Sequence, residues 1–143
     1  MFVKQISVFI ENKKGRLAAL TKELADHGFN LKALSIADTA DFGILRFISE
    51  DTDRVLQVIR DKGFTARVTD VLVVEVPDEP GGLARVVRIL DEADVSVEYL
   101  YSFVLSAPGK ALIMFRVSDN ERALEALQSQ QVRVVDEAHL RLA

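Results

Sequence analysis

One short loop, rich in glycine and acidic residues, is the part of this sequence best suited to bind a small molecule. Residues 77–83 read Pro-Asp-Glu-Pro-Gly-Gly-Leu and lie between an apolar β-branched run and an amphipathic helical pattern. The first N–H groups of a helix have no partner inside it, and glycine allows another molecule to approach closely. The loop therefore suits a carboxylate, and Asp78 or Glu79 suits an ammonium group.

The remaining reactive residues do not form a pattern typical of catalysis or metal binding. The chain has no cysteine, and its two histidines, His27 and His139, have no second ligand at a suitable spacing. Asp41-Phe42-Gly43 matches the metal-binding triplet of protein kinases, but the other kinase segments are absent. We therefore predict no enzymatic activity, no catalytic residue, no metal site and no cofactor.

Size and charge are those of an ordinary soluble protein. The chain has 143 residues, of which 49% are hydrophobic and 28% charged, enough for one domain or two small ones. A net charge of -4 gives no electrostatic reason to bind nucleic acid or an anionic membrane. No signal peptide or membrane-length apolar segment is present, so we expect a cytoplasmic protein.

The loop belongs to a unit that occurs twice. The first copy predicts a strand at 3–10, a loop at 11–15, a helix at 16–27, and strands at 31–37 and 44–49. A helix from Asp51 or Thr52 to Gly63 follows, and then a strand that begins at 64–68 and reaches towards Val71. The second predicts a strand at 71–76, a helix at 83–93, strands at 95–105 and 111–117, a turn at 106–109, a helix at 120–129 and a strand at 132–135.

The two copies align without a linker. Gly15-Arg16-Leu17 aligns with Gly81-Gly82-Leu83, and Ile48-Ser49 aligns with Val117-Ser118 at a spacing larger by three, so we expect the second turn to be longer by three residues. The order strand–helix–strand–strand–helix–strand predicts an α+β fold. It consists of two ferredoxin-like βαββαβ units in tandem, residues 1–69 and 70–143, with antiparallel sheets and helices on one face.

The strands are apolar on both faces, although helices cover only one. Leu72 and Val74 alternate with Val71 and Val73 along one strand. A bare apolar sheet face of this size is unfavourable in water. We therefore expect sheets to pair within the chain, across a homodimer, or both.

These motifs resemble those of ACT domains, and the resemblance covers essentially the whole chain. The second copy carries Asp78-Glu79-Pro80-Gly81-Gly82-Leu83, a close fit to the family loop. The first carries Gly28-Phe29-Asn30-Leu31, but Lys14 replaces the loop proline. The resemblance implies two ACT units that bind a free amino acid at ACT–ACT interfaces and regulate their own oligomer, a metabolic enzyme or another regulator.

The resemblance also implies which residues contact the effector: the loop after strand one of one unit and the second-strand region of another. Carried onto this chain, the first copy contributes Asn12, Gly15, Arg16, Leu17, Asn30, Leu31, Ile36 and Ala37. Asp38 and Asp41 also suit the ammonium group, and Phe42 is added as a candidate contact beside them. The second copy contributes Asp78, Glu79, Gly81, Gly82, Leu83, Val97, Tyr99 and Tyr101. Valine at Gly81 or Gly82 is expected to weaken binding and keep the fold.

Several of these residues also have structural interpretations. Asn12 and Asp78 are equally suited to cap helices. Tyr99 and Tyr101 alternate along one strand face and suit packing under a partner sheet as well as stacking on a ligand. Arg46 and Arg116 suit either an ion pair or an interface contact.

Other functions are compatible with parts of this pattern. ACT units can pair without a ligand and serve only as structural modules. RNA-binding domains of the RRM type share the strand–helix order, but residues 44–48 lack their aromatic pattern. A small enzyme on this fold lacks recognisable chemistry, and a metallochaperone lacks cysteine.

Overall fold

The computed structural model describes residues 2–38, 41–104 and 107–142. The chain forms two compact units, Lys4–Thr69 and Asp70–Ala143, the second including Met1–Val3. The elements in chain order are β1 (Val3–Glu11), α1 (Arg16–Asp26), β2 (Ala33–Asp38), β3 (Phe42–Ile48), α2 (Thr52–Asp61), β4 (Thr65–Pro77), α3 (Gly82–Glu92), β5 (Val97–Ser102), β6 (Lys110–Val117), α4 (Asn120–Ser129), β7 (Val134–Val135) and α5 (Glu137–Leu142).

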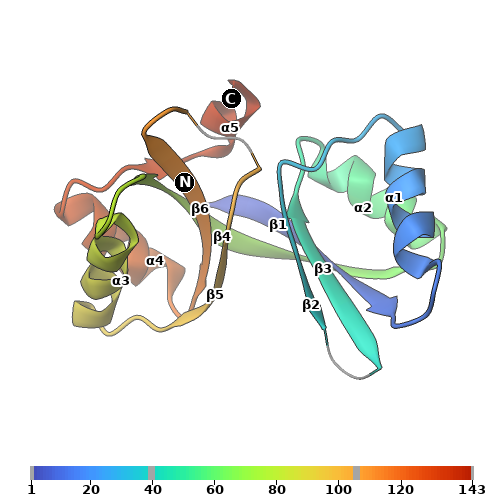
Figure 1. The fold of residues 1–143 in the computed structure, drawn as a ribbon, viewed down its shortest axis with the longest axis horizontal. Coiled ribbons are helices and arrows are strands. Elements are labelled where there is room, and N and C mark those ends of the chain that lie inside the picture. Colours follow the sequence, from blue (N-terminus) through green and yellow to red (C-terminus); the bar gives the residue numbers. More distant parts are fainter. Residues whose placement is uncertain (1, 39–40, 105–106, 143) are drawn as a thin grey trace. The chain divides into compact units, whose positions relative to one another are not determined.

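Both units have the same strand order. The order is β2-β3-β1-β4 in the first unit and β5-β6-β4-β7 in the second, and the described ladders are antiparallel. In each unit two helices lie on one face of the sheet, α1 and α2 in the first and α3 and α4 in the second (Figure 1). The predicted α+β fold of tandem ferredoxin-like units is confirmed.

The strand β4 serves both units, as the fourth strand of the first and the first strand of the second. The sequence predicted that a strand begins at 64–68 and reaches towards Val71, and that another strand covers 71–76. The two form one continuous strand, so the division between them is wrong. No glycine or proline lies between Thr65 and Val76, and Val68 and Thr69 favour extended backbone, so nothing interrupts the strand.

Further differences from the prediction lie in the second half of the chain. The fifth strand, β5, ends at Ser102 instead of 105, and β7 has only two residues, Val134 and Val135. The short helix α5 was not predicted, because six residues are too few to show a helical period. Its start is capped by Asp136, whose carboxylate accepts the His139 N–H at 3.0 Å. The predicted turn at 106–109 falls partly outside the described residues.

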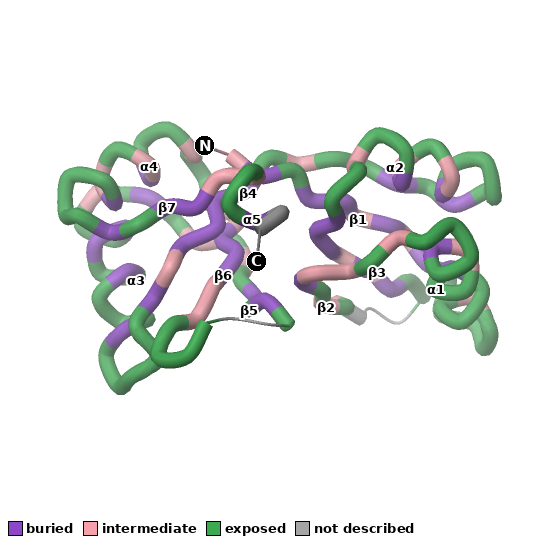
Figure 2. Tube along the Cα trace, turned by 90° about the horizontal axis from the view of Figure 1, so that it is seen from above, coloured by how far each residue is buried: buried purple, intermediate pink, exposed green. Residues whose placement is uncertain are grey.

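Each unit has its own core between helices and sheet. Phe47 is central to the first and Phe115 to the second, and both are fully buried. Figure 2 shows the helices buried along one side and exposed along the other. Leu17, Leu83 and Val87 are exposed although they are apolar, because they flank the buried stripes of α1 and α3 rather than lie on them.

Both faces of β4 are buried over residues 71–74. Val71 and Val73 are as fully buried as Leu72 and Val74 on the helix side. The large apolar side chains that remain exposed include Leu34 on β2 and Leu100 on β5, the outer strands of the two units.

The backbone confirms that the units are copies. Gly28 and Asp94, which occupy equivalent positions after the first helix of each unit, both have positive φ (77° and 60°), and so do Gly63 and Gln131, at 85° and 61°. In the ladders, Glu11 pairs with Phe42 and Pro77 with Lys110. The second turn is therefore longer by two residues, and the predicted three is wrong.

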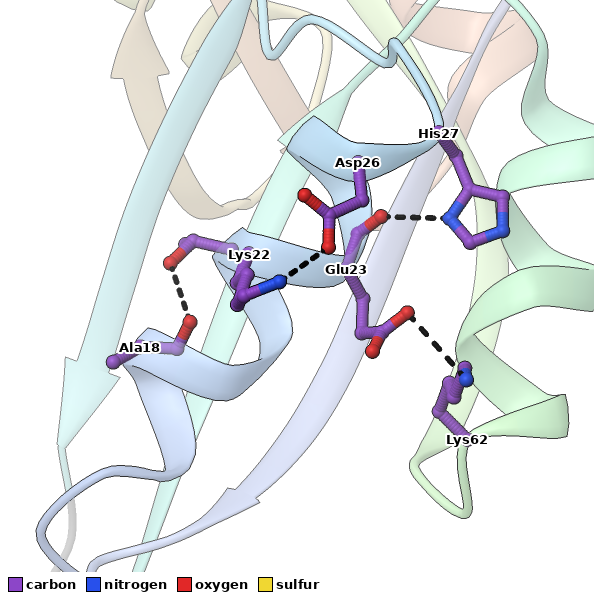
Figure 3. Close-up of polar contacts among 7 residues, drawn as sticks. Ala18, Lys22, Glu23, Asp26, His27 and Lys62 are labelled. Atoms are coloured by element: carbon purple, nitrogen blue, oxygen red, sulfur yellow. Dashed lines mark hydrogen bonds and ion pairs between the residues drawn. The ribbon is translucent and has the colours of Figure 1, made fainter.

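His27, the isolated histidine of the first unit, takes part in the polar contacts at the end of α1. The His27 Nδ1 lies 2.8 Å from the Glu23 carbonyl oxygen and caps the helix end (Figure 3). The Glu23 carboxylate lies 3.7 Å from Lys62, which follows α2, and Asp26 lies 2.6 Å from Lys22. The bond to the Asp26 carboxylate raises the pKa of Lys22.

Candidate functional site

Two glycine corners, residues 11–17 and 77–83, occupy equivalent places in the two units. In the first, the Asn12 N–H donates to the Asp41 carbonyl at 3.0 Å; in the second, the Asp78 N–H donates to the Gly109 carbonyl at 3.0 Å. One backbone hydrogen bond therefore links each corner to the turn between the next two strands of its unit. These bonds fix the backbone that leads into α1 and α3.

Each corner enters its helix through a glycine in the left-handed region. Gly15 has φ 93° and Gly81 has φ 89°, and both are exposed helix N-caps without a side-chain cap. The interpretation of Asn12 and Asp78 as capping residues is therefore wrong. Alanine or any larger L-residue is strained at this φ, which explains why glycine occupies the position in both copies.

The start of α3 presents unpaired backbone amides. The Arg85 N–H donates to the Gly81 carbonyl at 3.0 Å, and the Gly82 N–H turns back to Glu79 at 3.1 Å. Among the described residues no acceptor is found for the N–H groups of Leu83 and Ala84. Two amides and the positive end of the helix dipole can thus receive a carboxylate.

Gly82 has a different role from Gly81. It is buried, and a Cβ built on it would lie 2.2 Å from the Pro77 carbonyl oxygen and 3.1 Å from Val76 Cγ1. The expectation that valine there would keep the fold is wrong, because strand end and helix start are too close for any side chain.

A pocket of about 420 Å³ lies beside the second corner. Its lining residues are Glu75, Pro77, Glu79, Pro80, Gly81, Gly82, Arg85, Val86, Gly109, Lys110, Gln131, Val132 and Arg133. Three of the predicted contact residues, Glu79, Gly81 and Gly82, are among them. Asp78 and Leu83 belong to the same corner but do not line the pocket.

Charged side chains from strands β4 and β6, from helix α3 and from Arg133, which directly precedes β7, meet in this pocket. The two carboxylate oxygens of Glu75 lie 2.7 Å from Lys110 Nζ and 3.2 Å from Arg133 Nη1. The Arg85 guanidinium donates to the Gln130 carbonyl at 2.9 Å. Within the described residues Arg85 and Glu79 have no ion-pair partner, so each remains available to a ligand.

Four of these charged residues were missed by sequence reasoning: Glu75, Arg85, Lys110 and Arg133. Arg85 could have been found, because it lies four residues after Gly81 on the same side of the helix start. The others follow only from strand pairing, since Lys110 faces Pro77, and the Arg133 carbonyl accepts the Glu75 N–H at 3.0 Å.

The predicted strand residues of the second unit lie elsewhere. Val97 lines a separate pocket of about 290 Å³ with Asp91 and Asp94. Tyr101 is buried and pairs with Met114. Tyr99, which is partly buried, pairs with Arg116.

The two arginines of the third strands do not correspond. Arg116 forms an ion pair with Glu98, Nε to carboxylate oxygen, at 3.4 Å. Arg46 corresponds to Met114, because Phe42 corresponds to Lys110 in the two ladders.

In the first unit the predicted residues divide between the two ends of β2. Ile36 and Phe42 are half exposed near the corner, Ala37 pairs with Ile44, and the backbone of Asp38 pairs with Gly43. Thr39 and Ala40, in the predicted turn, lie outside the described residues.

Asn30 and Leu31 precede the other end of β2. The Asn30 carbonyl accepts the Ser49 hydroxyl at 3.0 Å, and Leu31 packs against the core. About five residues of strand, roughly 16 Å, separate them from the corner of their own unit.

Arg16 follows Gly15 at the first corner, where the second corner has Gly82. Its guanidinium lies over the Phe64 ring, 4.5 Å from the centroid. Its Nε is buried and has no hydrogen-bond partner in the described structure.

The described residues contain no cluster of three or more potential metal ligands. None of the described helices combines the length and apolar character needed to cross a membrane.

Comparisons with known proteins agree with the duplicated fold. A crystal structure of protein BT0572 from Bacteroides thetaiotaomicron is 39% identical, with 94% of this chain and 92% of that chain covered and a TM-score of 0.89. The regulatory subunit of aspartate kinase from Thermus thermophilus, in a ligand-free form, is 15% identical, with 88% and 91% covered and a TM-score of 0.64.

The corresponding subunit from Thermus flavus is 15% identical, with 88% and 90% covered and a TM-score of 0.62. At these identities the two kinase subunits show a shared fold only. A search of the curated proteins gave no match. The family model described as ACT domain pair matches residues 1–142, and the chain therefore belongs to this family.

Proposed function

We propose that this ACT domain pair is a non-catalytic regulatory protein that binds a free amino acid at its second glycine corner. The pocket beside Gly81 is the observation that carries the proposal, because it gathers charged side chains of both signs beside Gly81 and Gly82, which directly precede the unpaired amides of Leu83 and Ala84. The amides of Leu83 and Ala84 would receive the α-carboxylate, and the Glu79 carboxylate would receive the ammonium group. ACT domains typically bind amino acids, which supports this class of ligand.

The proposal includes a regulatory consequence. A ligand changes an equilibrium between two arrangements only by its differential affinity for them. We propose that ligand binding at the corner favours one arrangement with a second copy of the chain, or with a metabolic enzyme or regulator.

Substituting Glu79 by glutamine tests the pocket directly. Glu79 is exposed and has no ion-pair partner within the described residues, so the fold should be unchanged. Losing one charge-assisted hydrogen bond should weaken binding about tenfold. A thermal-shift screen of the twenty amino acids identifies the ligand, and calorimetry then gives both affinities.

The matched control is Glu125→Gln, which removes the same charge from an exposed position on α4 that does not line the pocket. It should bind like the unmodified chain. Equal weakening in both variants would contradict a role for Glu79. If no amino acid raises the unfolding midpoint, the alternative of a structural ACT pair without ligand is favoured.

The same proposal includes a homodimer formed through the outer strands. Leu34 and Leu100 are at equivalent positions of β2 and β5 and remain 44% and 39% exposed. Burying such side chains is favourable, and unpaired strand edges accept another strand. Light scattering at micromolar concentration should give twice the chain mass, and Leu34→Lys with Leu100→Lys should give the monomer. A monomeric unmodified chain would contradict this part.

A further inference from the structure

The pocket beside Gly81 carries more positive than negative charge. Arg85, Lys110 and Arg133 supply three cations, and Glu75 and Glu79 supply two carboxylates. Glu75 is only 17% exposed and is engaged by both Lys110 and Arg133. The charges left for a ligand are therefore the Arg85 guanidinium, the Glu79 carboxylate and the amides that begin α3.

An amino acid with an uncharged side chain would pair with only some of these charged and polar groups. Its carboxylate can take the helix amides and its ammonium group can take Glu79, which leaves Arg85 without an acidic partner. Arg85 donates through one nitrogen to the Gln130 carbonyl, and its other N–H groups have no carboxylate to bind in the described structure. A second carboxylate on the ligand would satisfy these donors and cancel the excess charge.

The first unit keeps the glycine corner but lacks four of the charged side chains that line this pocket. By the alignment of the two ladders and loops, Glu75, Arg85, Lys110 and Arg133 correspond to Phe9, Ala19, Phe42 and Thr65. None of these four counterparts is charged.

The space itself is also filled in the first unit. Gly82 corresponds to Arg16, and Val132 corresponds to Phe64. The Arg16 guanidinium lies 4.5 Å from the Phe64 ring centroid, so a side chain of the protein occupies the place that is open between Gly82 and Val132.

We propose that the pocket lined by Arg85, Lys110 and Arg133 selects an amino acid with an acidic side chain, and that each chain binds one such ligand, in its second unit alone. This rests on the proposed function, since it names the ligand class of the same site. The Arg85 guanidinium binds the side-chain carboxylate, Glu79 binds the ammonium group, and the α3 amides bind the α-carboxylate.

Calorimetry on the full chain with two isosteric pairs tests the proposal: glutamate against glutamine, and aspartate against asparagine. Whichever of glutamate and aspartate binds more tightly should bind at least about tenfold more tightly than its own amide. The amide loses the charge-assisted pair between the ligand side chain and Arg85. The stoichiometry should be one ligand per chain. Arg85→Gln should remove most of this preference while keeping the affinity for neutral amino acids.

The control is Arg88→Gln, one turn further along α3, which changes the net charge equally and does not line the pocket. It should retain the preference for the acid. If a neutral amino acid binds as tightly as either acid, the ligand class is wrong and the proposed function stands. If no amino acid binds, both fail. An acid preference that survives Arg85→Gln, or two ligands per chain, also overturns the inference.

Discussion

Replacing Gly82 by alanine is expected to lower the free energy of unfolding by about 2–3 kcal/mol, although it adds a single methyl group. That methyl group would lie 2.2 Å from the Pro77 carbonyl oxygen, a backbone atom that cannot rotate away. Pro77 ends β4 and Gly82 begins α3, so relief requires strand end and helix start to separate. Urea unfolding followed by circular dichroism measures the change as a lower midpoint with an unchanged slope.

Gly81→Ala is the matched control, because it changes the neighbouring residue in the same corner. A Cβ at Gly81 meets no atom within 4 Å, and the cost comes only from φ 89°. That cost is about 1 kcal/mol, so the control should be clearly more stable than Gly82→Ala. If Gly81→Ala and Gly82→Ala had equal stability, the strand end and helix start would separate without an energetic cost. The close approach of Gly82 to Pro77 would then not contribute to stability.

This difference decides how binding at the corner can be studied. A loss of affinity after substitution at Gly82 reports a damaged corner as readily as a lost ligand contact. Glu79 and Arg85 are better probes, because both side chains are exposed and neither belongs to the close contact between Pro77 and Gly82. Substitution there alters charge and leaves the backbone of the corner unchanged.

The fold was predictable because each unit is built from strong local patterns. The helix α4 was predicted to the residue, since Asp119 caps it by accepting the Arg122 N–H at 3.0 Å and its apolar period is regular. The continuity of β4 was not predictable from the same reasoning. The strand passes from one unit to the next, and only pairing with neighbours on both sides shows where it ends.

The candidate site divides in the same way. The glycine corner was visible in sequence, because its φ requirement and its position before a helix leave a local signature. The charges around it are not local. Lys110 reaches the corner through a ladder with Pro77, which is distant in the sequence, and an error of one position in the turn length moves a side chain to the other sheet face.

The second large effect is expected from the two buried phenylalanines of the third strands. Phe47→Ala and Phe115→Ala should each lower the free energy of unfolding by about 3–5 kcal/mol. Both rings are fully buried, and their cross-strand neighbours are themselves equivalent, Ile6 and Phe47 in one unit and Leu72 and Phe115 in the other. Urea unfolding of the two variants, measured side by side, gives the comparison.

Phe42→Ala is the control, because it removes the same ring from the same strand, β3, at a position that is 52% exposed. A half-exposed ring loses much less on truncation, so this variant should stay within about 1 kcal/mol of the unmodified chain. Similar losses for Phe47 and Phe115 would mean that the duplicated cores have kept equal packing while the corners diverged in charge. A loss below that of Phe42→Ala at either position would contradict the assignment of that ring to the centre of its core.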